Sequence, residues 1–102
     1  MLKIKKISDR IKEELCDAKW YAEEALKSKE DDKVLAETFY TLATEELKHM
    51  ELLHAQVVRL INEYKAQKGD PPADMQARYD YIHEEEIEKV KEVKILLAIY
   101  KG

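Results

Sequence analysis

Glu46 and His49 are the residues whose types and spacing best suit chemistry. On a helix, residues three apart lie about one turn apart on the same face. Both fall within an inward stripe where apolar residues are expected. That stripe is Leu35, Phe39, Leu42, Glu46, His49, Leu53, Leu60 and Tyr64. Because a carboxylate inside a bundle is costly unless it is paired or bound to a cation, we expect this pair to hold a metal ion.

Glu14 is the third candidate ligand. It interrupts an earlier apolar stripe of helical spacing, formed by Ile4, Ile7, Ile11, Ala18, Tyr21 and Ala25. The polar break at 28–32 is short, so the two helices should form an antiparallel hairpin. Glu14 lies about as far before this break as Glu46 lies after it, which should bring the two carboxylates face to face. Carboxylates with an imidazole suit iron or manganese and tolerate zinc.

The elements that position these residues can be read from the breaks in the chain. Asp32 suits a helix N-cap, Gly69 suits a C-terminal cap, and the prolines that follow are tolerated in a first helical turn. We therefore predict one all-α domain over 1–102. Its helices should span about 4–29, 33–68 and 73–101.

The last helix has an apolar stripe that Glu86 interrupts. The stripe is Met75, Tyr79, Ile82, Val90, Val93, Leu97 and Tyr100. His83 and Glu86 are in the reverse order of a Glu-x-x-His pair, so this helix should not complete a two-metal site. We expect it to pack against the distal half of the second helix and to mediate assembly.

A second copy of the chain is the simplest completion of the site. A di-iron site in a four-helix bundle takes one Glu from each of two helices and one Glu-x-x-His from each of the other two. One hairpin supplies half of this set, and a twofold axis supplies the rest. Four carboxylates would then balance two ferrous ions. We predict a homodimer or higher homo-oligomer, with a four-helix bundle completed by dimerisation.

Composition narrows the class of protein. The chain has 102 residues, 39 % of them charged, with only two Gly and two Pro, which is typical of helical proteins. A net charge of −4 argues against a nucleic-acid partner. The lone Cys16 excludes an intrachain disulfide and a four-cysteine metal site. No apolar run has the length of a membrane span, so we expect no membrane partner. The basic N-terminal residues are not followed by the apolar run of a signal peptide, so we expect a cytoplasmic location.

Three further residues and one further Glu-x-x-His pair are weaker candidates. Glu86 could be another ligand or could guide iron inward, or it could belong to a solvated acidic run. Asp17, one turn from Glu14, could also guide iron. Tyr21 could hydrogen-bond a ligand, or it could serve only in packing. Glu51-x-x-His54 repeats the spacing, but Glu51 lies about 140° from Glu46 at 100° per residue, so we expect this pair on the surface.

The hairpin over about 13–53 resembles the ferritin-like superfamily, and within it rubrerythrins and encapsulated ferritins. Glu13-Glu14-Leu15 followed by Trp20-Tyr21 is similar to the first helix of an encapsulated ferritin. The run Ala43-Thr44-Glu45-Glu46-Leu47-Lys48-His49 is similar to the metal helix of both groups.

This resemblance implies that Glu14, Glu46 and His49 bind iron at a ferroxidase centre between subunits. There Fe(II) would be oxidised to Fe(III) for iron storage or detoxification. It also implies ring-shaped assemblies and an encapsulin shell as a partner, which would place the protein inside that compartment.

Two alternatives to ferroxidation come from different classes. One is a peroxide-scavenging, rubrerythrin-like protein with two iron or manganese ions. The other is a non-catalytic helical interaction module, in which Glu14, Glu46 and His49 form only a polar network.

Overall fold

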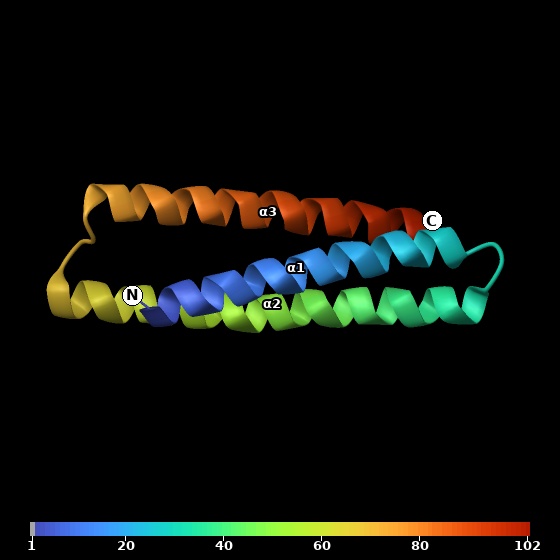
Figure 1. Ribbon diagram of the computed structural model, residues 1–102, viewed down its shortest axis with the longest axis horizontal. Coiled ribbons are helices and arrows are strands. Elements are labelled where there is room, and N and C mark those ends of the chain that lie inside the picture. The colour runs from blue at the N-terminus through green and yellow to red at the C-terminus, as the bar shows by residue number, and fades with distance from the viewer. Residues whose placement is uncertain (1) are drawn as a thin grey trace.

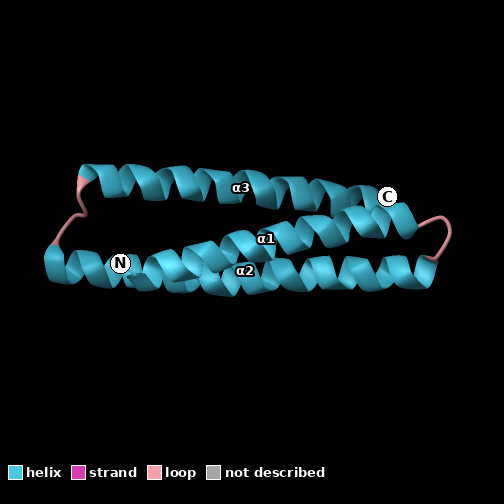
Figure 2. Cartoon of the chain, in the orientation of Figure 1, coloured by secondary structure: helices cyan, strands magenta, loops and turns pink. Residues whose placement is uncertain are grey.

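Three α-helices joined by two short loops make up the computed structural model, which describes residues 2–102 (Figure 1). They are α1 (Leu2–Ser28), α2 (Lys33–Lys68) and α3 (Ala73–Lys101). Figure 2 shows the two connections as loops between the helices, and Gly102 is the only other non-helical residue in this part of the chain. The all-α prediction is confirmed, and the helix bounds agree with it to within two residues.

The predicted caps lie at the ends of α2. The Asp32 side chain accepts a hydrogen bond from the Leu35 backbone N–H at 3.1 Å, which satisfies a donor that the first helical turn leaves free. Gly69 ends the helix with φ +81°, a backbone conformation that favours glycine. These two residues therefore define the length of α2.

Alanines form much of the contact between the antiparallel helices α1 and α2. Ala18, Ala22 and Ala25 of α1 and Ala36 and Ala43 of α2 are fully buried. Small side chains let the two backbones approach closely. Larger buried side chains complete the core, namely Ile4, Ile11, Leu15, Leu47, Met50, Val57, Val93 and Leu97.

The stripe predicted for α2 is less buried than expected. Phe39, Leu42 and Leu53 are half-buried, and Leu35 is exposed. The reason is that α2 carries apolar residues on two adjacent faces. One face, which includes Met50 and the alanines, packs into the bundle, and the predicted stripe lies beside it.

The packing of α3 differs from the prediction. α3 lies mainly along α1 and makes fewer contacts with α2. The stacked rings of His83 and His54 are one contact with the distal half of α2. Lys19 of α1 pairs with Glu92 of α3 at 3.2 Å. Near the C-terminal end of α3, the Tyr100 hydroxyl donates a hydrogen bond to Glu37 of α2 at 2.8 Å. The chain turns back at 69–72, so α3 runs antiparallel to α2 and lies against the hairpin, where most of its contacts are with α1.

Each of the three helices is long, at 27, 36 and 29 residues. Within residues 2–102, none is apolar over enough of that length to span a membrane.

Replacing Asp32 with alanine should lower the free energy of unfolding by about 1 kcal/mol, because the Leu35 N–H loses its cap. For a domain of this size, that corresponds to a fall in melting temperature of about 4–8 °C. Thermal denaturation followed by circular dichroism measures it. Asp31→Ala is the matched control, and an equal fall in both variants would contradict the capping role.

Candidate metal sites

Glu14 of α1 and Glu46 and His49 of α2 lie together between the two helices. One potential ligand atom of each lies within 4.8 Å of those of the other two. His49 Nδ1 is 3.4 Å from Glu14 Oε2 and 3.9 Å from Glu46 Oε1. The short turn at 29–32 sets this register, so the predicted proximity of the three side chains is confirmed.

Burial makes this cluster chemically unusual. The Glu14 side chain is 7 % exposed and that of Glu46 is 17 % exposed. The Oε2 atom of each is buried and has no hydrogen-bond partner among residues 2–102. Leaving a buried charged group unpaired is costly. The pair therefore needs either a shared proton or a cation.

The pKa shifts of the two carboxyl groups differ in direction. The pKa of Glu14 is lowered, chiefly because the neighbouring Glu46 carboxyl can donate a hydrogen bond to it. Burial raises the pKa of Glu46 to about 7, and the adjacent Glu14 adds to this shift. With a pKa of about 7, the Glu46 carboxyl is therefore partly protonated near neutral pH, whereas Glu14 is ionised. A divalent cation can replace that proton, because both carboxylates could then be ionised.

Arg10 is a neighbour that the sequence analysis missed. Its Nη2 atom lies 3.1 Å from Glu14 Oε1, on the opposite oxygen from His49. The spacing of four residues on one helix is the signal that could have identified it. Because Arg10 pairs with only one oxygen of Glu14, the unpartnered Oε2 atom remains available to a metal ion.

The donor set fits a hard or borderline divalent cation. Two carboxylates and an imidazole are ligands that iron and manganese accept. The His49 side chain is 54 % exposed, so the cluster is open on one side. At about 100° per residue, Glu46 lies about 80° around α2 from His54, which faces α3. The open side therefore lies away from the contact between α2 and α3.

Asp17 and Tyr21 differ in their relation to this cluster. Asp17 is exposed, yet its charge contributes to raising the pKa of Glu46. The Tyr21 ring stacks on Phe39 with centroids 6.2 Å apart. Within the described chain, no hydrogen bond joins the Tyr21 hydroxyl to a predicted ligand. Packing is therefore the role that its contacts support.

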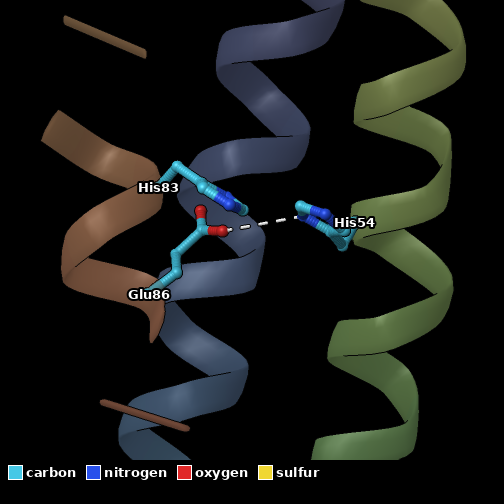
Figure 3. Close-up of side chains that lie close together, drawn as sticks. All are labelled: His54, His83 and Glu86. Carbon is cyan, nitrogen blue, oxygen red and sulfur yellow. Dashed lines mark ion pairs between the residues drawn. The ribbon is translucent and has the colours of Figure 1, made fainter. Parts of the chain in front are cut away.

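A second cluster lies between α2 and α3 and comprises His54, His83 and Glu86 (Figure 3). His54 Nδ1 is 3.9 Å from Glu86 Oε2, and the two imidazole rings stack with centroids 5.2 Å apart. Burial lowers the pKa of His54 and raises that of Glu86. Both shifts favour the neutral forms in the absence of a metal ion.

The second cluster changes two expectations. Glu51 is exposed as predicted, but His54 is half-buried and faces α3 rather than solvent. Glu86 lies with the two histidines and is not part of the group formed by Glu14, Glu46 and His49. His54 and His83 were missed because their proximity depends on where α3 packs. The His83-x-x-Glu86 spacing was the only local signal.

Comparison with known proteins identifies no relative that could assign these clusters. No protein-family model matches the chain, and no match was found among curated proteins or solved structures. The two clusters and the helical fold are therefore the observations from which a function must be argued.

Without metal, the protein should lose stability as the pH rises towards and through 7. Glu46 has a higher pKa in the folded protein, about 7, than its ordinary 4.5. Its contribution to stability is thus complete below about pH 4.5 and is lost as the pH rises through the folded value, by about 3 kcal/mol. Urea denaturation at pH 5 and pH 8, with chelator present, measures the change.

Two variants isolate this effect from the titration of other groups. Glu46→Gln keeps a hydrogen-bond donor beside Glu14, so it should remove this part of the pH dependence. Glu45→Gln changes an exposed neighbour and should retain it. The same pH dependence in both variants would contradict a shared proton at Glu46.

Proposed function

We propose that this protein binds ferrous iron through Glu14, Glu46 and His49 and acts as a ferroxidase of the ferritin-like kind. One observation carries the proposal: two buried carboxylate oxygens on facing helices have no partner, and an imidazole lies beside them. Hard oxygen ligands with one nitrogen suit iron. The positions also agree with those that the resemblance to ferritin-like proteins implies.

A homodimer is the assembly that would complete the site. On the open side, Leu42 precedes Glu46 by one turn, and Leu53 follows His49 by one turn. Trp20 of α1 is exposed and meets the half-buried Phe39 edge-on at 5.7 Å. Covering these apolar side chains with a second hairpin would remove them from water. The partner would bring its own copies of the three ligands to the two-metal site.

Within this site, the residues of the chain would bind and orient the ions. Glu46 would give up its proton, and Glu14 and Glu46 would supply negative charge from facing helices. His49 would bind through the ring nitrogen nearest the carboxylates. Bound ferrous ions would supply two electrons, one from each ion, to dioxygen, which takes up two protons and leaves as hydrogen peroxide. The ferric product would then leave for storage.

Iron content and mass test the binding and the assembly together. After anaerobic addition of Fe²⁺, we expect a dimer or larger assembly with one iron ion per chain, measured by light scattering and metal analysis. Glu46→Ala should lose the iron and the iron-dependent increase in mass while keeping its helicity. Glu45→Ala is the matched control. Unchanged iron content in Glu46→Ala would reject the assignment.

Product analysis distinguishes the candidate activities. Ferroxidation should release up to one hydrogen peroxide for two Fe²⁺ oxidised, and the yield should fall in His49→Ala. Consumption of added peroxide with an external reductant would instead support the peroxide-scavenging alternative. If Fe²⁺, Mn²⁺ and Zn²⁺ all fail to bind at Glu46 and to raise the melting temperature, the interaction module is the better account.

A further inference from the structure

We propose that His54, His83 and Glu86 bind a zinc ion that links α2 to α3. All three offer a ligand atom within 4.8 Å of the others. Figure 3 shows the side chains of His83 and Glu86 projecting from α3 towards His54 on α2. This inference does not depend on the proposed iron site, because the two clusters share no residue.

The ligand types favour zinc. Two imidazoles and one carboxylate form a nitrogen-rich set, which zinc binds at about 2.0–2.2 Å, most often with tetrahedral geometry. Ligand atoms around such an ion are about 3.4 Å apart, as follows from those bond lengths. The observed distance from His54 Nδ1 to Glu86 Oε2 is 3.9 Å. Small side-chain rotations would close the difference.

The local backbone already arranges these ligands. His83 and Glu86 are three residues apart on α3 and therefore share a face. The Glu86 side chain is only 13 % exposed, which limits its freedom, whereas His54 is 36 % exposed. The two imidazole rings are stacked with their planes 21° apart, and a nitrogen of each lies within 4.8 Å of a Glu86 carboxylate oxygen.

Space for a fourth ligand lies beside the cluster. A groove of about 390 Å³ is bordered by these three residues and by Met50, Ile87 and Val90. It is large enough for a water molecule, which commonly completes a zinc site with three protein ligands. Bound zinc would therefore join α2 and α3 across a groove where protein contacts are otherwise sparse, since α3 packs mainly on α1.

Zinc titration of tag-free protein tests this site. The starting variant carries Glu46→Ala and His49→Ala, so the first cluster cannot bind. We expect it to bind one zinc ion per chain with micromolar or tighter affinity, measured by calorimetry, and to melt at a higher temperature with zinc. Adding His83→Ala should abolish both effects. Adding Glu84→Ala, at the exposed neighbouring position, should leave both unchanged.

A spectroscopic probe reports the ligand set directly. Co²⁺ in place of zinc should give a visible absorption typical of low-coordinate nitrogen and oxygen ligation, and this absorption should be lost with His83→Ala or Glu86→Gln. No zinc binding by the starting variant would overturn the proposal. So would zinc binding that persists when His83 is replaced. Loss of iron from the other cluster would have no bearing on either result.

Discussion

The meeting of Glu14 and Glu46 between α1 and α2 is the constraint on which the rest of the account depends. Two buried carboxyl groups cannot both remain ionised without a counter-charge. In the metal-free protein, Arg10 and His49 lie on either side of Glu14, and the raised pKa of Glu46 lets that carboxyl keep its proton up to about neutral pH. A divalent cation could take the place of that proton, because both carboxyl groups could then be ionised.

The fold keeps this site at an edge of the bundle. Alanines bring α1 and α2 close together, and α3 covers another side of the hairpin. The half-buried stripe around Phe39, Leu42 and Leu53 is left on the open side of the cluster. In the proposed dimer, the apolar surface that the second chain would cover surrounds Glu14, Glu46 and His49. The same second chain would supply the remaining ligands of the two-metal site.

Short-range sequence patterns were sufficient to predict the helices and the proximity of Glu14, Glu46 and His49. Asp32 and Gly69 marked helix ends, and Glu14 and Glu46 interrupted apolar stripes at matching distances from a short turn. The second cluster could not be predicted in the same way. His54 lies about 80° around α2 from Glu46, and its meeting with His83 depends on how α3 packs. That packing reflects the shapes of whole helix faces, which no short motif encodes.

Anomalous diffraction at the iron absorption edge, from crystals prepared with Fe²⁺ without oxygen, would test the central claim most directly. We expect iron bound by Glu14, Glu46 and His49, next to the same residues of a twofold-related copy. The absence of an iron peak beside these three residues would contradict the proposed site.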